Sequence, residues 1–227
     1  MFLNKYLLSA SLVLVSFASV PAPAADNSTA ASAPSTQAAH DLRLRIGRGD
    51  YIAGKAKAEM CASCHGADGN SIDPQIPKLA GQYGDYISKQ MRNYLASTRT
   101  HQVMSGMAAT INDDDLADIS AYFAAQPMMK GDHASTNQLG KQLYENDDLS
   151  KMRMRCSSCH GVDGKGLDAS NPLFPVIGGQ HKEYLLTQMK NFRNGVRNNS
   201  DGGVMNITVH RLSDAELEAL AEYISGL

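Results

Sequence analysis

The sequence predicts an all-α protein made of two tandem copies of one small helical bundle. Three observations predict this fold class: apolar residues recur at helical spacing, no clear run of alternating β-branched residues occurs, and one residue pattern appears twice. We expect the copies to span residues 41–126 and 139–227. The linker between them is expected at residues 127–138, which contain Pro127 and Gly131.

The helical segments of the two copies correspond to one another. Residues 86–94 (YISKQMRNY) match residues 184–192 (YLLTQMKNF), and both have apolar residues at helical spacing. The last helix of each copy has a start signal. Ser213 and Glu216 form a capping-box pattern, and Asn112 precedes three aspartates that favour the positive end of a helix.

The composition excludes several classes of protein. The chain has 227 residues, 43% of them hydrophobic and 19% charged, with a net charge of -2, which excludes a disordered chain. This near-neutral charge gives no reason to expect nucleic acid or an acidic membrane surface as a partner. With no Trp and only 6% aromatic residues, each copy has a thin core and needs a metal, a disulfide or a large bound group.

The N-terminus has the features of an export signal. Residues 1–25 carry one charge, Lys5, followed by an apolar run of about 14 residues, and end in small residues suited to cleavage near Ala24 or Ala25. The run is shorter than the ~20 residues that span a bilayer, which favours cleavage over an uncleaved anchor. Residues 26–40 are rich in Ala, Ser and Thr and are expected to form a flexible tether.

The internal repeat is the most informative feature of the sequence. The separation between matched residues grows from 93 to 101 positions, and only in loop-like stretches, as expected for a duplicated domain. The matched pairs are Gly47 and Gly140, Tyr51 and Tyr144, Cys61 and Cys156, Pro77 and Pro175, and Met104 and Met205.

Each copy contains one Cys-x-x-Cys-His sequence, the attachment sequence of c-type haem. Two thiols three residues apart lie on one side of a helical turn and can bond both vinyl groups of one porphyrin, and the histidine that follows can bind its iron. A dithiol redox pair would need a βαβ context, and a zinc site would need four ligands. We therefore expect two covalently bound haem c groups. The residues are Cys61, Cys64 and His65 in the first copy, and Cys156, Cys159 and His160 in the second.

The repeat identifies the methionines expected to bind the irons opposite the histidines. Met205 is the only methionine between residue 192 and the last helix, and it lies twelve residues before Leu217. Met104 lies twelve residues before Leu116, whereas Met107 has no matching methionine. Methionine opposite histidine favours the reduced iron and raises its potential.

Two further sets of residues bear on the axial positions. His101 and His210 are the alternative sixth ligands, but they do not match each other in the repeat. Pro77 and Pro175 follow the two motif histidines, and a prolyl carbonyl there could accept the imidazole N–H and orient the ring. The alternative is that each proline only turns the chain.

Filled axial positions leave no open site for a substrate, so the pattern favours single-electron transfer over catalysis. We expect an electron carrier, not an enzyme, and expect each copy to be largely unfolded without haem. The alternatives are a dihaem peroxidase, which must open one iron, and the cytochrome subunit of a larger dehydrogenase.

Together these motifs resemble the dihaem cytochrome c4 family. The resemblance rests on the two haem motifs, on PKLAGQ (Pro77–Gln82) with its counterpart PVIGGQ (Pro175–Gln180), and on MSGM (Met104–Met107), and it covers residues 45–227. It implies two class I cytochrome c domains packed face to face, with haem propionates near the interface. It also implies histidine and methionine at both irons: His65 with Met104, and His160 with Met205.

The same resemblance implies partners and location. It implies a periplasmic carrier, in loose association with the membrane, that takes electrons from a quinol-oxidising complex or another donor and passes them to a terminal oxidase.

The sequence departs from the family pattern at the basic residues Lys151, Arg153 and Arg155 beside the second haem motif. They suit either a docking patch or a solvated face, and the pattern favours the solvated face.

Overall fold

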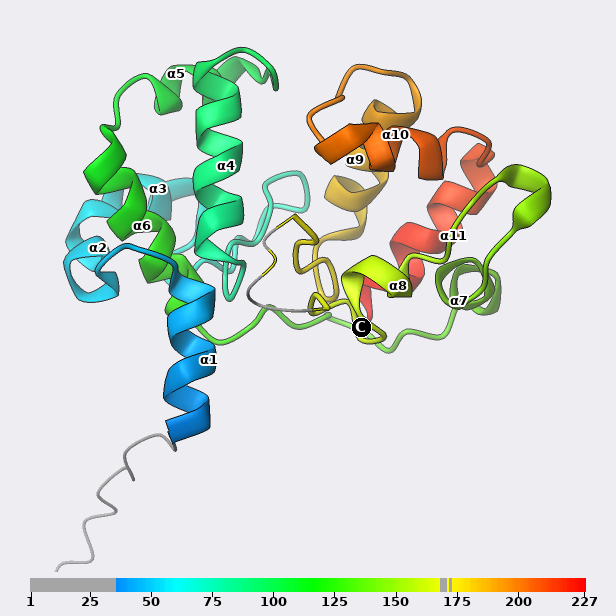
Figure 1. The fold of residues 1–227 in the computed structure, drawn as a ribbon, viewed down its shortest axis with the longest axis horizontal. Helices are drawn as coiled ribbons and strands as arrows, with labels where there is room; N and C mark the ends of the chain where they lie inside the picture. The colour runs from blue at the N-terminus through cyan, green and yellow to red at the C-terminus, as the bar shows by residue number, and fades with distance from the viewer. Residues whose placement is uncertain (1–35, 168–170, 172) are drawn as a thin grey trace, which may run out of the picture. The chain divides into compact units, whose positions relative to one another are not determined.

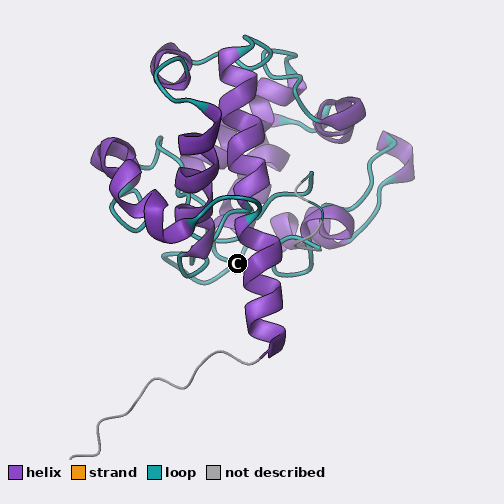
Figure 2. Cartoon of the chain, turned by 60° about the vertical axis from the view of Figure 1, so that its left-hand side comes forward, coloured by secondary structure: helices purple, strands orange, loops and turns teal. Residues whose placement is uncertain are grey.

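The computed structural model describes residues 36–167, 171 and 173–227, so the predicted signal (1–25) lies outside the described residues. These residues form helices and loops, with one isolated antiparallel bridge between Asp148 and Arg153, which confirms the all-α prediction (Figures 1 and 2). The N-terminal copy contains α2 (Tyr51–Lys57), α3 (Glu59–His65), α4 (Gly84–Leu95), α5 (Gln102–Ala108) and α6 (Asp113–Ala125). The C-terminal copy contains α7 (Gln138–Glu145), α8 (Ser157–His160), α9 (Lys182–Arg193), α10 (Val204–Val209) and α11 (Asp214–Ser225), with short 3₁₀ turns at Leu149–Lys151 and Asp201–Gly203.

The last helix of each copy begins where the capping pattern predicts. The side chain of Asn112 accepts a hydrogen bond from the backbone N–H of Asp115 at the start of α6. At the start of α11, Ser213 and Glu216 form the reciprocal capping box. Both caps satisfy backbone donors that a helix start otherwise leaves without partners.

In each copy the last helix crosses the first one at a glycine. A Cβ atom on Gly54 of α2 would lie 2.0 Å from the carbonyl oxygen of Asp118 on α6, and one on Gly140 of α7 would lie 2.1 Å from that of Ala219 on α11. Only glycine permits such close approach of two helix backbones. Gly54 is therefore the structural counterpart of Gly140.

This geometry corrects one part of the predicted repeat. The match of Gly47 and Tyr51 with Gly140 and Tyr144 is wrong, since Tyr51 is 41% exposed whereas Tyr144 is fully buried. The counterpart of Tyr144 is the buried Ala58, four residues after Gly54. The prediction failed because tyrosines were matched by identity and not by the helix face that they occupy.

The corrected match reveals an insertion in the C-terminal copy. Gly140 follows Gly54 by 86 positions, whereas Cys156 follows Cys61 by 95, so nine extra residues separate the first helix from the second haem motif. We call residues 146–155 the insertion loop. It contains the isolated bridge and one 3₁₀ turn.

A helix replaces the end of the predicted tether. Helix α1 (Thr36–Ile46) includes residues 36–40, which were expected to be flexible, and packs against α6 and α4. The guanidinium of Arg45 donates to the carbonyl oxygens of Ala124 at 2.7 Å and Gln126 at 3.2 Å, at the end of α6. Composition alone did not predict this helix, because the contacts of Arg45 that hold it are made with the distant helix α6. The rest of the tether, residues 26–35, lies outside the described residues.

The described residues belong to one compact unit, in which the two copies share an interface. The segment between α6 and α7 has no helix, yet its Met129 is buried against Tyr83 of one copy and Val176 of the other. No helix among the described residues is long and apolar enough to cross a membrane.

The basic residues of the insertion loop do not form a solvated face. Arg153 is buried, and its guanidinium donates to the carbonyl oxygens of Leu143 at 2.6 Å and Asn146 at 3.0 Å, at the end of α7. Lys151 forms an ion pair with Glu216. Arg155 alone of the three is exposed. The sequence could not distinguish a capping arginine from a solvated one.

We expect the variant Arg153→Met to lose about 1–3 kcal/mol of unfolding free energy, because the carbonyl groups at the end of α7, one of them on the buried Leu143, lose a charged donor. The matched variant Arg155→Met removes the same group from an exposed position and should change stability by no more than about 0.5 kcal/mol. Urea unfolding of the two proteins measures both values. Equal losses would contradict the capping role of Arg153.

An ion cluster on the N-terminal copy makes its stability depend on pH. The Lys57 ammonium lies 2.6 Å from a carboxylate oxygen of Asp115 and 2.6 Å from one of Asp118. Hydrogen bonds from Lys57 hold the pKa of both carboxyl groups below the ordinary value. Unfolded aspartate binds its proton near pH ~3.9, so this stabilisation is complete above that pH and is lost as the pH falls through the lower folded-state values.

We expect Lys57→Met to make the unfolding free energy less dependent on pH between about 5 and 2. The measurement is the urea midpoint at a series of pH values, compared with that of the unsubstituted protein. Parallel pH profiles for the two proteins would show that Lys57 does not lower these pKa values.

Candidate haem sites

The first haem motif lies on a short helix that ends abruptly. Helix α3 places Cys61, Cys64 and His65 within two turns and ends at Gly66, which has a φ of +82°. A Cβ atom on Gly66 would lie 2.6 Å from the carbonyl oxygen of Asn70, so the turn requires glycine. The second motif repeats this arrangement on α8, with its own positive-φ glycine directly after the histidine.

Both motif histidines are buried and held by a proline. The Nδ1 atom of His65 lies 2.9 Å from the carbonyl oxygen of Pro77, and that of His160 lies 2.9 Å from that of Pro175. These are the contacts that the sequence predicts. They assign the proton to Nδ1 and leave Nε2 of each ring as the nitrogen that is able to bind a metal. Among the described residues, neither Nε2 atom has a hydrogen-bond partner.

Burial keeps both imidazoles neutral. It lowers the pKa of His65 and His160 below the ordinary value, and the hydrogen bond to the prolyl carbonyl only partly opposes this effect. A neutral imidazole is the form that binds a metal.

No disulfide joins the four cysteines, so each sulfur is available for a thioether bond. Burial raises the pKa of the Cys61 thiol, and it raises that of Cys156 to about 11. Before haem attachment, burial therefore disfavours the thiolate form of Cys61 and Cys156. The described residues contain no group of three or more His, Cys, Asp or Glu arranged to hold a bare metal ion.

The predicted methionines lie on equivalent short helices. Met104 is half-buried on α5, and Met205 is half-buried on α10. Met205 packs on the same apolar cluster as Cys156. Of the alternative ligands, His101 is exposed and its Nδ1 atom accepts backbone N–H groups at the start of α5, and His210 is exposed at the end of α10.

This donor set fits a c-type haem in each copy. Two cysteine sulfurs that form no disulfide stand beside an imidazole whose Nε2 has no hydrogen-bond partner among the described residues, and a half-buried thioether lies on a separate short helix. A covalently held iron porphyrin needs these groups: thiols for its vinyl carbons and two soft neutral ligands for its iron.

Two buried arginines lie between the copies, and the sequence interpretation missed them. The Arg99 guanidinium donates to Tyr184 at 3.0 Å and Gln188 at 2.9 Å in the C-terminal copy. The Arg197 guanidinium donates to Tyr86 at 3.0 Å and to Gln90 at 3.1 Å in the N-terminal copy.

The charge of this pair is not balanced by the protein. Both arginines are buried, and they share the side-chain oxygens of Gln90 and Gln188. Among the described residues, no carboxylate forms an ion pair with either guanidinium. Buried cations without an anion are costly, so the pair suits an anionic group between the copies. Arg99 and Arg197 are 98 positions apart, as are Pro77 and Pro175, so the repeat held the signal that could have found them.

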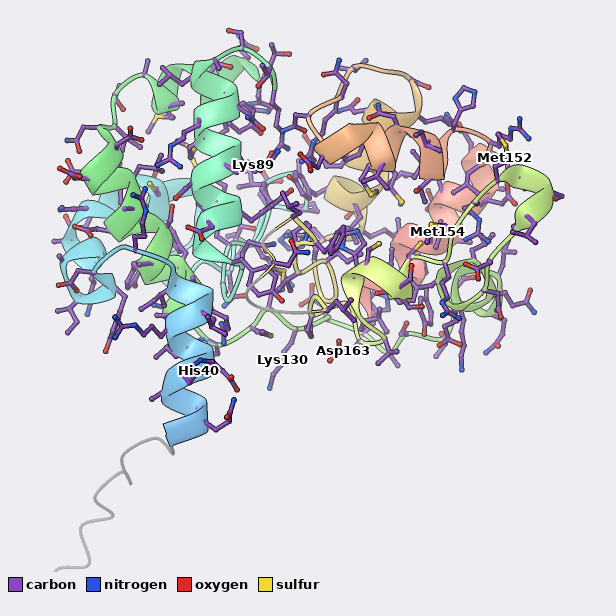
Figure 3. All side chains as sticks on the ribbon, viewed as in Figure 1. His40, Lys89, Lys130, Met152, Met154 and Asp163 are labelled. Atoms are coloured by element: carbon purple, nitrogen blue, oxygen red, sulfur yellow. The ribbon has the colours of Figure 1, made fainter. Side chains whose placement is uncertain are left out.

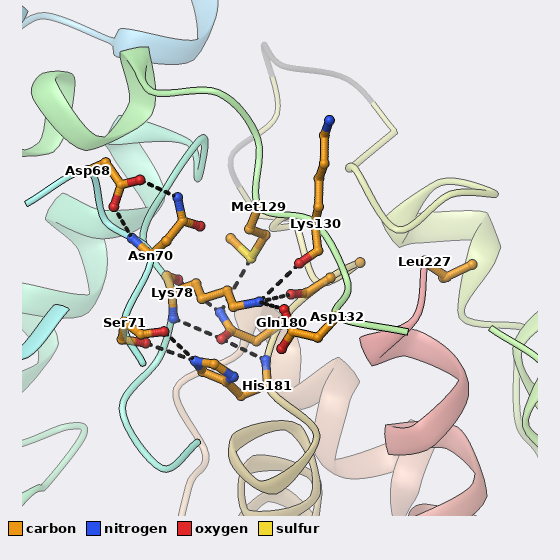
Figure 4. A network of polar contacts seen from close by, with 12 residues as sticks. Asp68, Asn70, Ser71, Lys78, Met129, Lys130, Asp132, Gln180, His181 and Leu227 are labelled. Atoms are coloured by element: carbon orange, nitrogen blue, oxygen red, sulfur yellow. Dashed lines mark hydrogen bonds and ion pairs between the residues drawn. The ribbon is translucent and has the colours of Figure 1, made fainter. Parts of the chain in front are cut away.

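A second set of contacts links each proline-bearing loop to the opposite copy. The side chain of Gln180 exchanges two hydrogen bonds with the backbone of Lys78, at 2.8 and 2.9 Å, directly after Pro77 (Figure 4). The side chain of Gln82 makes the same pair with the backbone of Val176, at 2.8 and 3.1 Å, directly after Pro175. Each proline-bearing loop is thus held by a side-chain amide of the other copy.

The same interface holds a buried lysine. The Lys78 ammonium donates to the carbonyl oxygens of Lys130 at 3.0 Å and Gly179 at 3.1 Å and lies 3.4 Å from a carboxylate oxygen of Asp132 (Figure 4). Nearby, the Nε2 atom of His181 lies 2.9 Å from the carbonyl oxygen of Ser71. These contacts join α9 and the interdomain segment to the N-terminal copy.

A helical fold that carries two such sites defines a c-type cytochrome. Comparison with known proteins agrees. The model of the Cytochrome c family matches residues 51–126 and 138–227. Cytochrome c4 of Pseudomonas aeruginosa is 41% identical over 182 residues, which cover 79% of this chain and 89% of that protein.

Two further relatives agree in fold or sequence. The crystal structure of reduced recombinant cytochrome c4 from Pseudomonas stutzeri has a TM-score of 0.73 at 38% identity and covers 79% of this chain and 99% of that one. The thiosulfate dehydrogenase electron acceptor of Stutzerimonas stutzeri is 30% identical, over 75% of this chain and 80% of that protein. The chain belongs to the dihaem cytochrome c4 family, and its cofactors are two covalently bound haem c groups.

Proposed function

We propose that the protein is a periplasmic carrier that moves single electrons between two redox proteins, the acceptor being a terminal oxidase. The observation that carries this proposal is the double donor set, in which a neutral, proline-held imidazole and a methionine thioether are available in each copy. The cytochrome c4 family is a family of electron carriers. The signal-like residues 1–25 support export.

Each group in the site has a stated task. The bound haem supplies a one-electron couple. The Nε2 atoms of His65 and His160 would bind the iron, while the prolyl carbonyls hold the proton at Nδ1 and orient the rings. Met104 and Met205 would supply the second ligand in each copy and exclude exchangeable ligands, so the protein would transfer electrons without binding a substrate at the metal.

The arginine pair is proposed to hold the haem propionates. Arg99 and Arg197 supply positive charge between the copies, and the propionates are the acidic groups of the expected cofactor. Charge-assisted hydrogen bonds of this kind orient a carboxylate well. With both cofactors anchored at one interface, an electron can pass between the copies over a short path.

The donor is proposed to be a quinol-oxidising complex. A sulfur-oxidising enzyme is the second candidate, because two relatives at 28–30% identity are named thiosulfate dehydrogenase electron acceptors. Steady-state reduction of the purified protein by each kind of enzyme separates the two.

The decisive experiment is a redox titration followed by visible absorption. We expect two low-spin centres that each take up one electron, with spectra of histidine–methionine ligation. A high-spin or bis-histidine centre would instead support a peroxidase. Pigment that acid and organic solvent remove from the polypeptide would contradict covalent attachment.

A further inference from the structure

The insertion loop exposes three apolar side chains beside the second haem motif. Leu149 is 87% exposed, Met152 is 65% exposed and Met154 is 61% exposed. Figure 3 labels the two methionines on the segment that joins α7 to α8. Isolated exposed apolar residues are ordinary, but three within six positions of one loop present an unusual amount of apolar surface to water.

The loop is held rigidly in this exposed state. Asp148 and Arg153 exchange two backbone hydrogen bonds at 2.8 and 2.9 Å, and the Asp148 carboxylate accepts the backbone N–H groups of Ser150 and Lys151. The buried Arg153 guanidinium ties the loop to the end of α7. The apolar side chains are therefore displayed on an ordered backbone.

Met152 has a strained backbone conformation within this loop. Its φ of +50° and ψ of +40° lie in the left-handed region, where glycine or asparagine is usual. Such a conformation is disfavoured for other residues and persists where the surroundings enforce it. A long apolar side chain at an exposed, strained position points to a role in contact with another molecule.

The N-terminal copy has no counterpart of this loop. There, Ala58 leads directly into α3, and the haem motif follows within three residues. In the C-terminal copy the loop ends at Arg155, which directly precedes Cys156. A molecule seated on the loop therefore lies beside the second haem and not beside the first.

We propose that the insertion loop is the docking surface for a redox protein that exchanges electrons with the C-terminal haem, through an apolar centre and an acidic rim on that partner. The proposal rests on the proposed carrier function. Arg155 and Arg211 supply the charge, since both are exposed and, among the described residues, neither forms an ion pair. The Arg211 guanidinium lies 3.3 Å from the carbonyl oxygen of Ser150, at the loop itself.

The chemistry of the loop favours a protein over a lipid surface. Methionine is flexible and polarisable, which suits the brief, adaptable contacts of an electron-transfer complex. Membrane-interface segments rely on Trp or Tyr, and the loop contains no aromatic residue.

The test compares a loop variant with a matched control in the full haem-loaded protein. The loop variant combines Leu149→Gln, Met152→Gln and Met154→Gln. The control is Met60→Gln, which changes a 51%-exposed methionine directly before Cys61 of the first haem. Each reduced protein is oxidised by washed respiratory membranes, with oxygen uptake as the readout, and separately by ferricyanide.

We expect the loop variant to lose about tenfold in its second-order rate with membranes, the usual effect of removing contacts worth about 1.4 kcal/mol at the centre of an interface. Its rate with ferricyanide and both reduction potentials should stay unchanged, and Met60→Gln should match the unsubstituted protein in every assay. Replacing Arg155 and Arg211 with glutamine should weaken the dependence of the membrane rate on ionic strength.

An unchanged membrane rate for the loop variant, or an equal loss for Met60→Gln, would overturn the docking proposal. So would binding to phosphatidylglycerol vesicles that the loop variant abolishes, because the loop would then contact lipid. Failure of the unsubstituted protein to reduce the membranes while it still reduces ferricyanide would contradict the proposed oxidase-linked carrier function itself.

Discussion

Replacing Met205 with alanine lowers the reduction potential of one haem centre by on the order of 0.2 V, within the about 0.8 V over which axial ligands set haem potentials. The other centre keeps its potential, because Met205 packs only on the C-terminal apolar cluster. Met104→Ala should produce the same change at the other centre alone. A redox titration of the two variants, with absorption spectra at each potential, measures both effects.

Met107→Ala is the control for this pair. Met107 is half-buried on α5, three residues from Met104, but has no matching methionine in the repeat. We expect Met107→Ala to change either reduction potential by only a small fraction of the change that Met205→Ala causes. A large shift for Met107→Ala together with none for Met104→Ala would show that Met107, and not Met104, binds the iron of the first haem.

The double variant Cys61→Ser and Cys64→Ser is expected to lose the first haem and unfold the N-terminal copy. Among the described residues, five of the eleven buried hydrophobic residues of that copy are alanines, against two of fourteen in the C-terminal copy. Without a large bound group, so small a core cannot offset the entropy of ordering the chain. The measurements are haem content by absorption and helix content by circular dichroism.

The matched variant, Cys156→Ser with Cys159→Ser, should remove one haem but a smaller share of the helix. Its copy retains the larger core, which includes the fully buried Tyr144 and Leu217. A stable, fully helical protein after loss of the first haem would contradict the dependence on haem that the composition predicts.

The repeated motifs predicted the fold class and the prolyl contacts of the two motif histidines because their spacing has a direct physical cause. A Cys-x-x-Cys-His turn must be helical, and a proline at a fixed distance after it can place a carbonyl at Nδ1 of the imidazole. The contacts of His65 with Pro77 and of His160 with Pro175, both at 2.9 Å, follow this logic. The capping residues of α6 and α11 were predictable for the same reason, since capping is local.

What the sequence could not predict depends on tertiary contacts. The close approach at Gly54, the anchoring of α1 by Arg45 and the burial of Arg153 all involve partners distant in sequence or on a helix face that identity matching does not show. The arginine pair could not be predicted from the sequence, because the partners of Arg99 and Arg197 lie in the opposite copy. Interfaces between repeats are the part of a fold that a single sequence shows least.

The reciprocal amide contacts of Gln82 and Gln180 have a consequence for how the protein can be divided. Each copy supplies a glutamine amide that holds the proline-bearing loop of the other copy, and this loop orients the motif imidazole. We therefore expect the two copies to stay associated if the chain is cut between α6 and α7. Either half produced alone would instead have a water-exposed, loosened loop at its iron ligand. The smallest piece that can be transplanted into another protein with its redox properties intact is therefore the pair.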